Sequence, residues 1–192
     1  RDTDRSRGLG DVYKRQTQID EDFFSRNTEL TDCSIIFSNG KLKTVPEKLF
    51  ANNKKVTTFN SLFANTESFE SVPAGLFANN PEVDSFRMLF SGTSLKSVPA
   101  GLFANNHKVT NFQSAFSKTA IQSVPADLFA GCGKVTTFMS CFTGCSELQS
   151  VPAELFKSSG AFTTVTKTAF NNIFKDCTSL TEVPAGLFDG FT

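Results

Sequence analysis

A Val-Pro pair recurs along this chain at an almost constant interval. The pairs begin at Val45, Val72, Val98, Val124, Val151 and Val183. The steps between them are therefore 27, 26, 26, 27 and 32 residues. A fixed period of this length is typical of a solenoid, in which each repeat forms one coil and buries its apolar face only against the neighbouring coils.

The apolar positions inside each repeat are equally regular. In the repeat that begins at Leu95 they are Leu95, Val98, Leu102, Phe103, Val109, Phe112, Ala115 and Phe116. The neighbouring repeats keep apolar residues at the same places, while the residues between them vary. This pattern indicates the inward positions of a stacked core. The chain has 22 Phe, one Tyr and no Trp, and buried Phe supplies a large apolar area with no polar atom to satisfy.

The residues around each Val-Pro pair predict a short strand followed by a tight turn. Pro holds the preceding Val in the β region and has no N–H for a ladder, so a strand should stop there. Pro also suits the first helical position, and we expect one helical turn from Pro99 to Ala104. Short parallel strands stacked about 4.8 Å apart are expected near residues 43–45, 70–72, 96–98, 122–124, 149–151 and 181–183.

The second half of each repeat has helical spacing. Val109, Phe112 and Phe116 stand at i, i+3 and i+7, which predicts a short helix with Thr110 as its cap. Asn105-Asn106 before it suits a left-handed or Asx-type turn. The expected fold class is α/β: a solenoid of 26–27-residue coils with short parallel strands and short helical turns.

Two stretches carry a resemblance to a known family. Residues 142–151 and 174–183 resemble the Phe-x-x-Cys-x-x-Leu-x-x-Ile/Val signature of BspA-type leucine-rich repeats, and the resemblance extends over residues 17–192. The coils are longer than the common pattern, and Cys occupies its place in only two of them. The resemblance implies a leucine-rich-repeat solenoid from a bacterial cell-surface or secreted protein. Several such proteins bind host proteins or other bacteria.

The repeat pattern divides the chain into two parts. Residues 1–16 lack the pattern and resemble a translated adapter scar from metagenomic sequencing, with a disordered basic leader as the alternative. Residues 17–192 are expected to form the solenoid, with a degenerate first coil, five complete coils and a truncated last coil that begins at Leu180. Neither end has a recognisable polar capping repeat, so we expect a metagenomic fragment of a longer protein.

Charge and motif content argue against several classes of function. The 19 basic and 19 acidic residues balance, which gives no electrostatic footprint for nucleic acid or an anionic membrane. The five Cys include no Cys-x-x-Cys, and the single His, His107, is expected in a solvated bend, so no metal or cofactor is predicted. No Ser-His-Asp set, phosphate-binding Gly loop or spaced carboxylate pair is present. We therefore expect no enzyme, and no segment inserted in a membrane.

The cysteines and asparagines occupy repeated places. Cys33 and Cys141 are expected to be small buried hydrophobes. Cys145 and Cys177 stand at equivalent places in adjacent coils, where a disulfide is conceivable, although the family resemblance implies stacked reduced thiols. The pairs Asn52-Asn53, Asn79-Asn80 and Asn105-Asn106 are expected to satisfy backbone groups of successive bends, with a metal or sugar site as the alternative.

Two surfaces are candidates for ligand binding. The outward strand face has polar side chains without aromatic anchors, which favours a weak, multivalent contact. The second surface is a loop, because the chain takes 14 residues from Phe156 to Phe170 where other complete coils take nine, and repeat insertions often bind. Its Phe162 either fills a core place or is displayed. The candidate binding residues are Lys96, Ser97, Gln122, Ser123, Gln149, Ser150, Ser158, Ser159 and Phe162.

These features predict a non-enzymatic adhesion module that contacts a host or microbial protein or glycan. The alternative function is a structural spacer or accessory repeat region of a larger surface protein. Fold alone does not decide between them.

Overall fold

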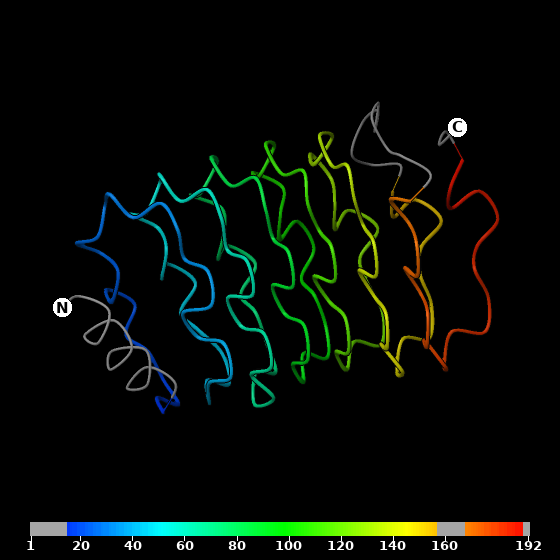
Figure 1. The fold of residues 1–192 in the computed structure, drawn as a ribbon, viewed down its shortest axis with the longest axis horizontal. Helices are drawn as coiled ribbons and strands as arrows, with labels where there is room; N and C mark the ends of the chain where they lie inside the picture. The colour runs from blue at the N-terminus through cyan, green and yellow to red at the C-terminus, as the bar shows by residue number, and fades with distance from the viewer. Residues whose placement is uncertain (1–14, 157–167, 190–192) are drawn as a thin grey trace.

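The computed structural model describes residues 15–156 and 168–189. The expectations for residues 1–14 of the leader and for residues 157–167 of the long coil lie outside this range. The described chain winds into coils that follow one another in a row from the N-terminal to the C-terminal end (Figure 1). The repeat period found in the sequence is therefore the period of the stack.

One segment of each coil carries most of the hydrogen bonding between coils. We call these the turn segments: residues 33–39, 59–65, 86–92, 112–118, 138–144 and 170–176. Alternate N–H groups donate to the next coil, as from Phe59 to the Ser85 carbonyl (3.1 Å) and from Ser61 to the Arg87 carbonyl (2.8 Å). The N–H groups between them turn back on their own coil, as from Leu62 to the Phe59 carbonyl (3.2 Å). Each turn segment before residues 170–176 thus joins its coil to the following one along its whole length.

The expected helix in the second half of the repeat is wrong. The third and seventh residues of every turn segment have positive φ, as at Ser114 (55°) and Lys118 (56°). Left-handed residues this frequent cannot form a right-handed helix, so Thr110 caps nothing. The phenylalanine rings give the physical reason. The rings of Phe90, Phe116 and Phe142 stack with centroids 5.6 and 5.5 Å apart. Successive coils are therefore too close at this place for packed helices, whose axes lie about 8–10 Å apart.

The expected strand positions are also wrong. Among the described residues, parallel pairing appears only as isolated bridges, which join Asp32, Thr58, Ser85, Asn111 and Thr137 in succession. Near the Val-Pro pairs, adjacent described coils share at most one backbone bond, as from the Gln122 N–H to the Lys96 carbonyl (3.2 Å). The following Pro has no N–H to continue a ladder. The bridge residues instead stand one position before the first residue of a turn segment, for the five segments from 33–39 to 138–144.

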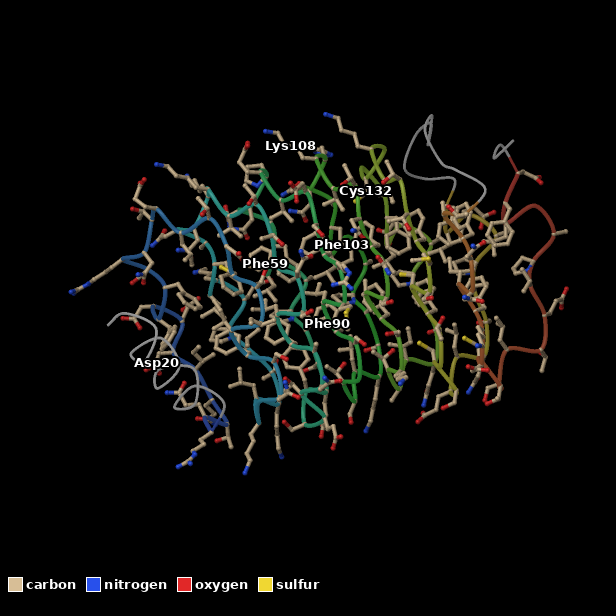
Figure 2. All side chains as sticks on the ribbon, viewed as in Figure 1. Asp20, Phe59, Phe90, Phe103, Lys108 and Cys132 are labelled. Carbon is tan, nitrogen blue, oxygen red and sulfur yellow. The ribbon has the colours of Figure 1, made fainter. Side chains whose placement is uncertain are left out.

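The expected core residues are confirmed. All eight apolar positions of the coil that begins at Leu95 are buried, and Phe116 is fully enclosed. The rings form columns along the stack, and the labelled Phe59, Phe90 and Phe103 lie inside it while Lys108 reaches out at one edge (Figure 2). Cys33 and Cys141 are fully buried as small hydrophobes. The sequence pattern therefore predicted which side chains point inward, but it did not predict the backbone conformation of the coil.

The long coil does not disturb the stack on its far side. Phe138 stacks on Phe170 (5.6 Å) and Phe142 on Phe174 (5.8 Å). The Phe142 N–H also donates to the Ile173 carbonyl (3.0 Å), as in the other coils. The expectation that the register resumes after the extra residues is confirmed.

Candidate functional site

Two exposed columns run along the face next to the Val-Pro pairs. We call them the polar stripe: Lys43, Thr44, Glu70, Ser71, Lys96, Ser97, Gln122, Ser123, Gln149 and Ser150. Each pair lies between two buried apolar residues, such as Leu95 and Val98 around Lys96 and Ser97. The alternation holds the polar side chains outward in every coil. Six of the residues expected to bind ligand therefore share one surface.

A groove of about 360 Å³ borders the polar stripe. Four successive coils line it at the bends that lead from the turn segments into the stripe. Its lining is Glu67, Gly92, Thr93, Ser94, Lys118, Thr119, Ala120, Gly144, Ser146 and Glu147. The Gln122 side chain on the stripe donates from Nε2 to Oε2 of Glu147 on the groove (3.2 Å). The groove and the stripe thus form one continuous polar surface.

Small residues at the bends create the groove. Gly92 and Gly144 have φ of 72° and 74°, a conformation that glycine adopts without steric cost. A Cβ on Gly92 would lie 2.7 Å from Oδ1 of Asn65, so the space is closed to a side chain. The Thr93 and Thr119 hydroxyls donate to carbonyls of their own coils (2.8 Å each). The groups left for a ligand are the charges of Glu67, Lys118 and Glu147 and the hydroxyls of Ser94 and Ser146.

The groove was not anticipated from the sequence. The available signal was a small residue at most of the positions after residues 91, 117 and 143, which read Gly-Thr-Ser, Lys-Thr-Ala and Gly-Cys-Ser. Ser158, Ser159 and Phe162, the other expected binding residues, lie outside the described residues.

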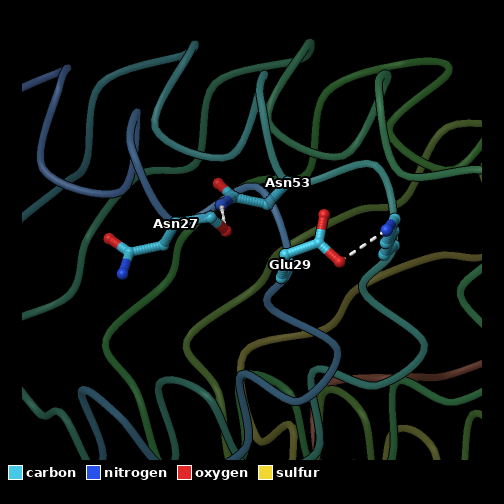
Figure 3. A network of polar contacts seen from close by, with 4 residues as sticks. Asn27, Glu29 and Asn53 are labelled. Carbon is cyan, nitrogen blue, oxygen red and sulfur yellow. Dashed lines mark hydrogen bonds and ion pairs between the residues drawn. The ribbon is translucent and has the colours of Figure 1, made fainter.

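A row of buried asparagines lies at the other bends of the coils. We call Asn53, Asn80 and Asn106 the asparagine file. Nδ2 of Asn53 donates to the carbonyls of Phe24 (3.1 Å) and Asn27 (2.8 Å) of the preceding coil. Figure 3 shows the bond to Asn27. Asn80 and Asn106 repeat this pair of bonds one coil further each. All three side chains are fully buried. The expected backbone-satisfying role is confirmed for Asn53, Asn80 and Asn106, and the expected left-handed turn at Asn105-Asn106 is wrong, because neither residue has positive φ.

The cysteines are reduced and buried. All five are free thiols, and Cys145 and Cys177 donate from Sγ to the carbonyls of Phe116 (3.0 Å) and Phe142 (3.1 Å). Burial raises the pKa of the Cys33 and Cys132 thiols from 9.0 to about 12. A raised pKa keeps sulfur in its unreactive thiol form at neutral pH. These cysteines therefore serve packing and backbone hydrogen bonding.

The described residues contain no cluster of three or more His, Cys, Asp and Glu side chains that could hold a metal. They contain no helix long and apolar enough to cross a membrane. His107 is exposed, with Nδ1 3.0 Å from the Gly131 carbonyl.

Comparison with known proteins identifies the architecture. No family model matches the sequence, and no curated protein matches it. A chain of the Toll–Spatzle complex, from Drosophila, is similar in structure, with a TM-score of 0.65 and 23% identity over 83% of this chain and 19% of that one. The fold is shared. The glycosylated form of that complex gives a TM-score of 0.61 at 21% identity, covering 90% of this chain and 21% of the other.

The chain is accordingly a solenoid of the leucine-rich-repeat type. The leucine-rich repeat domain of APL1B matches at 13% identity and a TM-score of 0.46, covering 81% of this chain and 62% of that one. The present chain spans about a fifth of the length of the Toll chains that it matches.

Proposed function

We propose that this chain is a non-enzymatic module that binds a protein ligand through the polar stripe and the adjoining groove. The observation that carries the proposal is the continuity of the two features across successive coils, joined by the bond between Gln122 and Glu147. A surface that repeats with the coil offers an extended ligand the same contact several times, which raises avidity without requiring a strong individual contact.

A protein ligand is supported over a glycan by two considerations. The similar Toll chain was solved in complex with Spatzle. No Trp or Tyr lies among the described residues, so the stripe lacks the rings on which a sugar would stack. The resemblance to BspA-type repeats further supports a bacterial cell-surface or secreted protein. A structural spacer would show no ligand at this surface.

The test is a binding assay on a panel of purified host matrix proteins, namely fibronectin, laminin and collagen, with mucin glycans as a separate arm. A double substitution, Ser97→Arg with Ser123→Arg, adds bulk and charge at the centre of the polar stripe. Ala104→Arg, at an exposed bend, makes the same chemical change elsewhere.

We expect at least one protein of the panel to bind, and the stripe variant to weaken that binding roughly tenfold, about 1.4 kcal/mol. The bend variant should bind as the unsubstituted chain does. Equal binding by both variants would exclude the stripe. Binding of mucin glycans alone would replace the protein ligand with a sugar, and binding of nothing would favour the spacer.

A further inference from the structure

The groove beside the polar stripe is shaped by the lengths of four successive bends. In the bends that follow Gly92 and Lys118, two residues separate the turn segment from the next buried apolar residue. In the bends that follow Asn65 and Gly144, three residues do so. The two shorter bends lie between the two longer ones along the stack. The groove therefore has a floor of short bends with a longer bend on either side.

Each of the longer bends carries a glutamate, and one of the shorter bends carries a lysine. Glu67 and Glu147 line the groove three coils apart, with Lys118 between them, and all three side chains are exposed. Neither Glu67 nor Lys118 forms an ion pair with another described residue. Glu147 accepts a hydrogen bond from Gln122 (3.2 Å), a neutral donor that leaves the negative charge of the carboxylate uncompensated.

The polar stripe continues the same order of charge beside the groove. Glu70 lies three residues after Glu67, and Lys96 occupies the place of Glu70 one coil further along. Both are exposed, and neither has an ion-pair partner among the described residues. Along the stack the surface thus presents negative charge, then positive charge from two successive coils, then negative charge again. We call these five side chains the charge series: Glu67, Glu70, Lys96, Lys118 and Glu147.

The spacing of the charge series matches an extended peptide laid along the stack. Three coil steps of about 4.8 Å separate Glu67 from Glu147, about 14 Å in all. An extended chain advances about 3.3 Å per residue and points alternate side chains to one face, so residues i, i+2 and i+4 span about 13 Å on that face. A basic residue at i, an acidic residue at i+2 and a basic residue at i+4 would meet Glu67, Lys118 and Glu147 in turn.

We propose that the groove selects, within a protein ligand, an extended segment of the order basic-x-acidic-x-basic. The inference rests on the proposed function, because it names the part of the protein ligand that lies in the groove. The glutamates on either side attract the two basic side chains, and the lysines between them attract the acidic one. The same lysines repel a segment with a third basic residue at its centre, and such repulsion is an effective way to reject wrong partners. Exposed ion pairs contribute little individually, so the charge series provides selectivity rather than tight binding.

The test uses the full chain and synthetic peptides with capped termini. The matched peptide has the core Arg-Ser-Glu-Ser-Arg. The scrambled peptide, Glu-Ser-Arg-Ser-Arg, has the same composition in a different order, and the basic peptide is Arg-Ser-Arg-Ser-Arg. NMR titration of the isotope-labelled chain at about 20 mM salt, where screening is weak, gives each Kd. We expect the matched peptide to shift the amide signals of Gly92 and Gly144 and to bind about fivefold more tightly than either of the others.

Charge reversal in the chain gives the decisive comparison. A variant in which each Glu of the charge series is replaced by Lys, and each Lys by Glu, should prefer the core Glu-Ser-Arg-Ser-Glu to the matched peptide. Every position is exposed, so the fold should be retained, and thermal melting checks that it is. Glu154→Lys reverses the charge of an exposed residue outside the groove and should keep the original preference.

The outcomes separate this inference from the proposed function. Equal binding of the matched and scrambled peptides, tighter binding of the basic peptide, or an unchanged preference in the reversed variant would overturn the charge order. The proposed function would still stand in each case if Ser97→Arg with Ser123→Arg weakened binding of a matrix protein. Peptide selectivity that follows the charge series, together with matrix binding that the stripe variant leaves intact, would support the segment and overturn the role of the stripe.

Discussion

At the scale of single residues, the stacked phenylalanines concentrate the stability of the coil. Phe116 lies between Phe90 and Phe142, with ring centroids 5.6 and 5.5 Å away, and has no exposed surface. When a side chain is packed on both sides along the stack, its truncation leaves a cavity that the neighbouring side chains cannot fill by a small shift. The cost of truncation should therefore approach the upper range for core Phe.

Phe116→Ala should lower the free energy of unfolding by about 3–5 kcal/mol, measured by urea denaturation. Ser97→Ala, an exposed position in the same coil, should change it by less than about 0.5 kcal/mol. A fully stable Phe116 variant would contradict the stacked core.

Ile35 has a backbone conformation unsuited to its side chain. It is β-branched, has φ of 57° and is 63% exposed, whereas the left-handed conformation costs most residues about 1–2 kcal/mol. Ile35→Asn should stabilise the chain by about 1 kcal/mol, because Asn adopts this conformation readily. The neighbouring Ile36→Asn should destabilise it, since Ile36 packs against the core. Urea denaturation gives both values.

At the scale of the coil, apolar spacing predicted burial but not secondary structure. Positions i, i+3, i+4 point inward in a helix, and the turn segments place Phe112, Ala115 and Phe116 inward as well. The turn segment differs from a helix by the left-handed conformation at Ser114 and Lys118. Neither Ser nor Lys predicts that conformation from the sequence. Gly92 and Gly144 occupy the second of these places in other coils and were the available signal.

The asparagine file should be the most sensitive polar feature of the coil. Asn80→Ala removes the side-chain donor to the carbonyls of Phe50 and Asn53 (3.1 and 2.9 Å), each of which keeps one backbone N–H donor, from Asn53 and from Val56. Each hydrogen bond contributes about 0.5–1.5 kcal/mol net, so the loss of both should lower the free energy of unfolding by about 1–3 kcal/mol in urea denaturation. Asn79→Ala changes the exposed neighbour and should cost less than about 0.5 kcal/mol. Equal losses would show that the file does not hold the bends.

The buried thiols should make stability fall at high pH. The pKa of Cys132 is about 12 in the fold against an ordinary 9.0, so the folded state holds its proton more tightly. Its contribution is complete below pH 9 and is lost as the pH rises from 9 towards 12. The free energy of unfolding should decline over this range less steeply in Cys132→Ala. No thiol should react with an aromatic disulfide reagent at pH 8 until the chain unfolds; rapid labelling of the native chain would contradict the burial.

At the scale of the whole molecule, the repeat period was enough to predict the solenoid and its register across the long coil. The rings of Phe138 and Phe170 stack although the segment between coils is longer there. Removing five residues from within 157–167, which restores the common length, should therefore leave the melting temperature within about 4 °C. A loss of cooperative unfolding would show that the extra residues are needed to connect the coils.

The candidate site was only partly predictable. Alternation around Leu95 and Val98 was enough to place the polar stripe on the surface. The groove depends on how four successive bends align in space, and on Gly92 and Gly144 approaching Asn65 and Lys118 of preceding coils. Such distances between coils are not encoded in the spacing of any one repeat.

The direction of the hydrogen bonds in the turn segments has an electrical consequence. At each of the interfaces between successive turn segments, four N–H groups point toward the C-terminal end, with N to O distances of 2.7–3.1 Å. Peptide dipoles aligned in this way add, as they do along an α-helix. The sum leaves partial positive charge at the C-terminal end of the stack and partial negative charge at the N-terminal end, the reverse of a helix. A chain with no net charge thus has a permanent axial dipole, and dissolved chains would orient along an applied electric field.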